Sequence, residues 1–83
     1  MKQKYVWVAY VQYRLDDPMI HVFQSKVKAR KYVIDLMKEF LKEDSWEDED
    51  IANEVTYFKQ RDYFYLEEYT AFIKKCSYET ESP

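Results

Sequence analysis

Three features of the sequence predict an α+β fold. The first 24 residues hold two stretches rich in β-branched and aromatic residues, separated by a turn, which indicates a hairpin. After Ser25 the spacing of the apolar residues changes from the period of a strand to that of a helix. Strand-forming residues return after residue 54. We therefore expect a four-stranded antiparallel sheet in ββαββ order, with one main helix across one face.

The hairpin is predicted from residues 5–15 and 19–24. Alternate residues of the first stretch, from Tyr5 to Leu15, are all apolar or aromatic, so they define one face of a strand. Asp16, Asp17 and Pro18 form the turn, because Pro fixes φ and Asp bonds to nearby backbone. Residues 19–24 then form the second strand.

The main helix is predicted at residues 26–42, with Ser25 as its N-cap. Its apolar residues are spaced alternately three and one apart, which places them on one stripe of a helix: Ala29, Tyr32, Val33, Leu36, Met37, Phe40 and Leu41.

The segment 43–54 contains seven acidic residues and no basic residue. Ser45 followed by Asp48 resembles a capping box, and acids in a first turn favour the helix dipole. A short acidic second helix near residues 46–53 is one interpretation, and a solvated loop is the other.

A third strand is predicted at residues 55–60 and a fourth at 63–73, joined near Arg61 and Asp62. Glu67 and Glu68 interrupt the second of these patterns and mark a bulge or a solvent edge. Residues 1–76 are expected to form a single domain, and the polar segment 77–83 is expected to be a frayed tail.

The amino-acid composition excludes several classes of function. The chain has 83 residues, of which 47% are hydrophobic and 19% aromatic, enough for one small core without a disulfide. Glycine is absent, which excludes Walker loops, dinucleotide fingerprints and EF-hand loops. The lone cysteine indicates a reducing compartment. No signal peptide or membrane span is recognisable, so we expect a cytoplasmic protein.

The predicted strands carry more aromatic side chains than one helix can bury against the sheet. Tyrosines lie on three of the four predicted strands, and alternation sends them to both faces of the sheet. Some rings then lie on an open face or edge, where they form a partner surface or a homodimer seam. The alternative is that these tyrosines simply cover a solvated face.

No constellation of residues indicates an enzyme. His21 and Cys76 are the sole histidine and cysteine, and no oxyanion-hole motif accompanies them. Two soft ligands are too few for a zinc site, and the acidic run lacks the spacing of a calcium loop. We expect no catalytic residue, no metal and no cofactor.

Charge is distributed unevenly along the chain. Residues 1–34 carry seven bases and two acids, and residues 35–83 carry six bases and fourteen acids. A compact acidic run can imitate a phosphate backbone and dock onto a basic nucleic-acid-binding site. The acidic residues predicted to make this contact are Glu43, Asp44, Glu47, Asp48, Glu49 and Asp50. The aromatic anchors predicted beside them are Trp46, Tyr57, Tyr63 and Tyr65. A solvated connector is the other interpretation of the run.

A basic cluster at the start of the main helix supports an alternative, a small nucleic-acid-binding domain. Lys26, Lys28, Arg30 and Lys31 oppose the helix dipole and could bind phosphate, pair with the chain's own acids, or form a solvated face. Strand aromatics could stack on bases. The net charge of −3 opposes this function, since affinity for nucleic acid depends on neutralising phosphates.

The sequence also resembles known small proteins. A hairpin ending in Val22-Phe23-Gln24-Ser25, a helix opening with Ala29-Arg30 and the segment Tyr65-Leu66-Glu67-Glu68-Tyr69 resemble short uncharacterised ββαββ proteins of phages and their bacterial hosts. Small, acidic, tyrosine-rich chains are also similar to phage-encoded inhibitors of host defence, including anti-CRISPR proteins. That resemblance implies a non-enzymatic inhibitor in the host cytoplasm, whose partner is a CRISPR or other nuclease complex.

Overall fold

The computed structural model describes residues 3–66 and 68–79. The elements follow one another as β1 (Gln3–Tyr13), β2 (Met19–Phe23), α1 (Lys26–Glu43), α2 (Asp48–Arg61), β3 (Tyr63–Leu66) and β4 (Tyr69–Glu79). The strands form one antiparallel sheet in the order β2-β1-β4-β3. The predicted α+β class, with a four-stranded antiparallel sheet, is therefore confirmed. The short second helix expected near residues 46–53 is longer than predicted, because α2 continues to Arg61.

The β1–β2 hairpin forms where it was predicted, but its turn begins earlier. Arg14 adopts a left-handed backbone with φ 57°, which ends β1 at Tyr13. Leu15, predicted on the apolar face of the first strand, lies instead in the turn and is 100% exposed. The turn therefore includes Arg14 and Leu15 as well as the predicted Asp16, Asp17 and Pro18.

Helix α1 confirms the predicted main helix. The Ser25 hydroxyl accepts the Lys28 backbone N–H at 3.4 Å, as expected of an N-cap. Of the predicted stripe, Ala29, Val33, Met37 and Leu41 are buried, while Tyr32, Leu36 and Phe40 are partly buried against the core. Ile34, which was not part of the predicted stripe, is buried with them.

The end of α1 closes with a Schellman motif that uses serine in place of glycine. Ser45 has φ 66°, and its N–H donates to the Lys42 carbonyl at 3.0 Å. The Trp46 N–H donates to the Leu41 carbonyl, also at 3.0 Å. The predicted capping box is therefore wrong, since Ser45 terminates α1 and Glu47 is the N-cap of α2, without a side-chain hydrogen bond.

Helix α2 replaces the third strand predicted at residues 55–60. Ile51, Val55 and Phe58 recur at helical spacing and are all buried, so the segment covers its apolar side as a helix. Asp48, Glu49 and Asp50 occupy the first turn, where they favour the dipole. Packing of this stripe overrides the strand preference of Val55, Tyr57 and Phe58.

The segment predicted as a fourth strand at residues 63–73 is divided into two strands. Asp62 ends α2 in a left-handed conformation, and β3 begins at the next residue. Glu68 lies in the connection to β4, while Glu67 falls outside the described residues. Strand β4 continues to Glu79, so the first three residues of the predicted tail extend the sheet, and residues 80–83 are not described.

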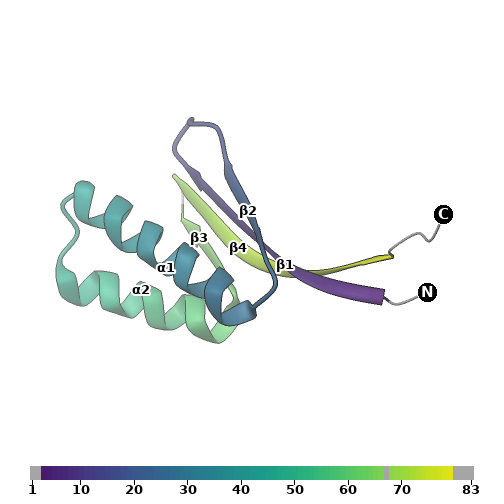
Figure 1. The fold of residues 1–83 in the computed structure, drawn as a ribbon. Helices are drawn as coiled ribbons and strands as arrows, with labels where there is room; N and C mark the ends of the chain where they lie inside the picture. Colours follow the sequence, from purple (N-terminus) through teal and green to yellow (C-terminus); the bar gives the residue numbers. More distant parts are fainter. Residues whose placement is uncertain (1–2, 67, 80–83) are drawn as a thin grey trace.

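Both helices pack on the same face of the sheet (Figure 1). Ala9 and Val11 of β1 and Ala71 and Ile73 of β4 point to the helices and are buried there. The N-terminal part of β1 and the C-terminal part of β4 run on together past the helices (Figure 1).

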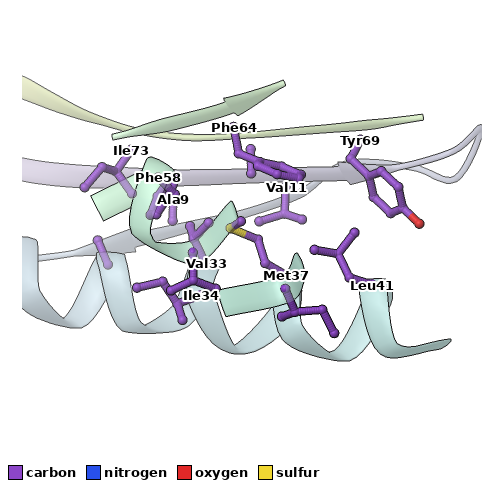
Figure 2. Packing of buried hydrophobic residues seen from close by; sticks show 14 residues of the cluster. Ala9, Val11, Val33, Ile34, Met37, Leu41, Phe58, Phe64, Tyr69 and Ile73 are labelled. Carbon is purple, nitrogen blue, oxygen red and sulfur yellow. The ribbon is translucent and has the colours of Figure 1, made fainter. Parts of the chain in front are cut away.

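The core lies between the sheet and the helix pair (Figure 2). Its largest fully buried side chains are Phe58 from α2, Phe64 from β3, and Leu41 and Val33 from α1. Every element except β2 contributes a buried residue, and Met19 and Phe23 of β2 pack against the core's edge. Within the described part of the chain, neither helix is long and apolar enough to cross a membrane.

Candidate protein-interaction surfaces

The face of the sheet opposite the helices carries a row of apolar residues across all four strands. Tyr10 pairs with Ile20 on one side and with Phe72 on the other, and Phe72 pairs with Tyr63. Directly paired residues of a sheet point to the same face. The row therefore runs in the order Ile20, Tyr10, Phe72, Tyr63, from β2 to β3.

The side chains of this row are held in place by contacts with one another and remain accessible to solvent. The rings of Tyr10 and Phe72 stack at 4.9 Å with an interplanar angle of 13°, and the Tyr10 hydroxyl donates to Gln12 Oε1 at 3.1 Å. Ile20 remains 57% exposed, and Tyr63 47% exposed. The central rings are thus ordered by each other, while the ends of the row stay open to solvent.

Neighbouring residues widen the row into a patch. Val22 pairs with Val8 on the same face and is 60% exposed, and Tyr65 is 74% exposed beside Thr70. We call the uncovered side of the sheet the open face; its central residues are Val8, Tyr10, Ile20, Val22, Tyr63, Tyr65 and Phe72. Among the side chains that the structure describes, the charged residues of this face are Lys4 and Lys74, and none is acidic.

The predicted acidic surface is assembled around the α1–α2 connection, at a different place from the open face. Glu47, Asp48, Glu49 and Asp50 line an open pocket of about 370 Å³ together with Ser45 and Trp46. Within the described residues, these four acids and Glu43 form no ion pair. They therefore form a concentrated negative end of the molecule.

Asp44 differs from the other predicted acids because the fold uses its carboxylate. It accepts hydrogen bonds from the Tyr13 hydroxyl and the Arg14 guanidinium, each at 2.7 Å, and from the Tyr69 hydroxyl. The hydrogen bond from Tyr69, followed by that from Tyr13, lowers the pKa of Asp44. Burial and the Asp44 carboxylate raise the pKa of Tyr69. Asp44 thus ties α1 to β1 and β4 and is not free for a partner.

The predicted aromatic anchors are not gathered beside the acids. Trp46 is half-buried against the core at the acidic end. Tyr57 and Tyr63 meet edge-to-face at 6.2 Å where α2 adjoins β3, and the Arg61 guanidinium lies 4.5 Å from the Tyr57 ring. Tyr65 lies on the open face. Of the four anchors, the structure therefore places one with the acidic surface.

The basic cluster at the start of α1 is partly neutralised by an acid that the sequence analysis did not single out. Lys26 Nζ and Arg30 Nη2 lie 3.0 and 2.9 Å from the two Asp62 carboxylate oxygens. Burial acts to raise the pKa of Asp62, but the hydrogen bonds from Arg30 and Lys26 outweigh it and lower the pKa. Lys31 pairs with Asp35 at 2.7 Å, and Lys28 alone of the cluster forms no ion pair among the described residues.

His21 and Cys76 lie on opposite faces of the sheet. His21 pairs with Ala9 on the helix side, where its ring lies 4.6 Å from that of Tyr32, and Cys76 pairs with Val6 on the open face. Within residues 3–66 and 68–79, no three His, Cys, Asp or Glu side chains are grouped as metal ligands.

Comparison of the chain with protein-family models, with curated proteins and with solved structures finds no significant match. The open face and the acidic end are therefore the features from which a function has to be inferred. The sequence analysis predicted rings on an open face but did not assign Phe72 to it, because residues 69–79 were not recognised as a complete strand. Strict alternation of Tyr69, Ala71 and Ile73 with Thr70, Phe72 and Lys74 is the signal that could have identified it.

Proposed function

We propose that the chain is a non-enzymatic protein-binding module that docks a partner protein on the open face. The observation that carries this proposal is the row of Ile20, Tyr10, Phe72 and Tyr63 on the side of the sheet that no helix covers. Contiguous exposed apolar patches mark interaction sites, and tyrosine is enriched in them. The two lysines on this face suit a partner whose contact surface is apolar with an acidic margin.

Site-directed photo-crosslinking in the producing cell tests this proposal. A photoreactive phenylalanine analogue at Tyr65, 74% exposed on the open face, is compared with the same analogue at Val27, 72% exposed on α1. We expect position 65 to capture a defined protein that excess untagged chain displaces. Equal capture at the two positions, or capture that a Phe72→Lys variant leaves unchanged, contradicts the proposal.

The acidic end supports a second candidate function, an inhibitor of the phage type. In this proposal Glu43, Glu47, Asp48, Glu49 and Asp50, with Trp46 as anchor, dock onto the basic nucleic-acid-binding site of a host protein such as a CRISPR or other nuclease complex. The observation that favours it is the absence of ion pairs around these five acids in the described part of the chain. Unneutralised carboxylates steer association with basic surfaces.

Charge reversal separates this candidate from the first one. Binding to host-lysate proteins is measured at rising salt for Asp48→Lys/Asp50→Lys. The matched control is Asp16→Lys/Asp17→Lys, which makes the same change in net charge at exposed positions of the β1–β2 turn. The inhibitor candidate predicts loss of a salt-sensitive complex in the first variant alone. Binding that survives reversal of Asp48 and Asp50 removes it.

The alternative function is nucleic-acid binding through Lys26, Lys28, Arg30 and Lys31. Gel-shift titrations test it. Because Asp62 and Asp35 already pair with three of these four side chains, we expect a flat titration with single-stranded RNA and DNA at low salt. A shift that Lys28→Glu weakens would support the alternative.

A further inference from the structure

The two ends of the open face carry charges of opposite sign. Lys4 and Lys74 are exposed toward the end of the sheet that runs on past the helices. Asp16 and Asp17 are exposed in the β1–β2 turn, at the other end of the sheet (Figure 1). Within the described part of the chain, none of these four side chains forms an ion pair.

The β1–β2 turn adjoins the open face through Gln12. This residue lies on the open face, two positions beyond Tyr10 along β1. Its side-chain amide donates to the Asp16 backbone carbonyl at 3.3 Å, which holds the turn beside this end of the face. Arg14, the basic residue of the same turn, is already paired with Asp44 at 2.7 Å. The acidic charge of the turn is therefore not neutralised by its own arginine.

A two-fold axis along the row of apolar residues brings unlike charges together in a pair of chains. Lys4 lies six positions before Tyr10 and Asp16 six positions after it, so the row lies between the two charges. When a second copy is turned over about this axis, its strands run opposite to those of the first copy. The lysine end of each copy then faces the aspartate end of the other. An axis along the strands would instead place lysine against lysine, so the charges favour the first arrangement.

The apolar residues meet in the same arrangement. The row of one copy lies against the row of the other, which covers its exposed ends, Ile20 and Tyr63. Sheets pack face to face in this way when their strand directions are roughly aligned. Strands about 4.8 Å apart, over about eight residues of length, offer roughly 400 Å² per copy. Contacts of this size are typical of weak association, so the dimer dissociates on dilution and returns the exposed face of the single chain.

We infer that two copies of this chain form a dimer through their open faces, with Lys4 and Lys74 of each copy facing Asp16 and Asp17 of the other. The strands run antiparallel across the interface. This inference rests on the proposed function and names the partner that the open face takes, which is a second copy of the chain. The acidic margin of that partner is its β1–β2 turn.

Reciprocal charge reversal tests the inference. Lys4→Glu/Lys74→Glu makes both ends of the open face acidic, and Asp16→Lys/Asp17→Lys makes both ends basic. Each variant alone should dimerise roughly tenfold more weakly than the native chain at low salt, because both charge contacts become repulsive. An equimolar mixture of the two should regain the native affinity, since each contact again joins unlike charges. Sedimentation equilibrium measures the association, and circular dichroism confirms that each variant is folded.

The matched control is Lys28→Glu/Lys38→Glu, which makes the same change in net charge as the lysine variant at exposed positions of α1. It should leave the association nearly unchanged. A native chain that remains monomeric over the accessible concentrations overturns the inference. A dimer that the two end variants weaken no more than the control does, or that their mixture fails to restore, overturns it as well.

Photo-crosslinking at Tyr65 separates this inference from the proposed function. The inference predicts that the captured protein is the chain itself. Capture of a different protein by a monomeric chain overturns the inference and leaves the proposed function standing. The absence of any defined capture, together with a monomeric chain, overturns both.

Discussion

Tyr10 and Phe72 stack face to face on the side of the sheet away from both helices, with ring centroids 4.9 Å apart. They belong to the two central strands, and Ile20 and Tyr63 continue the row to the edges. Two stacked rings at the middle of an uncovered sheet give the open face a fixed shape, which a binding surface needs.

The stack also contributes to stability. We expect Phe72→Ala to lower the free energy of unfolding by about 1–2 kcal/mol, because it removes both the ring contact and partly buried apolar area. The matched control is Tyr65→Ala, whose side chain is mostly exposed and whose loss should change stability by less than about 0.5 kcal/mol. Urea unfolding measures both variants. Equal effects would show that Phe72 is no better ordered than Tyr65.

The Asp62 carboxylate joins the end of α2 to the start of α1. Asp62→Asn keeps a residue that tolerates φ 63° but removes the charge that Lys26 and Arg30 contact. We expect a loss of about 1–2 kcal/mol, since hydrogen bonds between charged groups are stronger than neutral ones but are screened at partly exposed sites. Asp35→Asn, at the exposed pair with Lys31, should cost less than about 0.5 kcal/mol. Thermal or urea unfolding showing the reverse order would refute this role of Asp62.

Ser45→Gly should stabilise the protein. Ser45 holds the left-handed position of the Schellman motif at φ 66°, where a side chain is unfavourable and glycine is not. We expect a gain of about 0.5–1 kcal/mol, after allowing for the greater freedom of glycine in the unfolded chain. Ser45→Ala keeps the unfavourable Cβ and should give no gain. A destabilised glycine variant would mean that the Ser45 side chain contributes more than its backbone costs.

Asp44 makes stability depend on pH in the acid range. Because its pKa in the folded protein is below the usual 3.8, its contribution is fully present above about pH 4 and is lost as pH falls through the folded value. We expect Asp44→Asn to be less stable than the native chain at neutral pH, with the difference shrinking below pH 4. Tyr69→Phe, which removes the hydrogen bond that lowers the pKa of Asp44 most, should give part of that loss. A constant difference between native chain and Asp44→Asn from pH 7 to pH 2 contradicts the assignment.

Much of the fold was predictable because local pattern and tertiary structure agree in the first half of the chain. The stripe from Ala29 to Leu41 and the Ser25 cap fixed α1 correctly. The acidic end was also predicted from composition, because five of its six carboxylates form no ion pair within the described part of the chain.

The second half could not be predicted in the same way. Strand preference at Tyr57 and Phe58 conflicts with the helical spacing of Ile51, Val55 and Phe58, and burial decided in favour of α2. Asp44 and Asp62 resemble solvated acids in the sequence. Their roles depend on contacts with residues about 30 positions away, such as Tyr13 and Arg30.

Solvent exposure of the isoleucine methyl groups tests the central claim most directly. The chain has four isoleucines: Ile20 lies on the open face and is 57% exposed, while Ile34, Ile51 and Ile73 are buried in the core. Methyl relaxation is recorded by NMR with a soluble, inert gadolinium chelate. The account predicts strong relaxation of the Ile20 methyl groups and weak relaxation of the other three residues. Protection of Ile20 equal to that of Ile51 would show that this face of the sheet is covered, and would contradict the account.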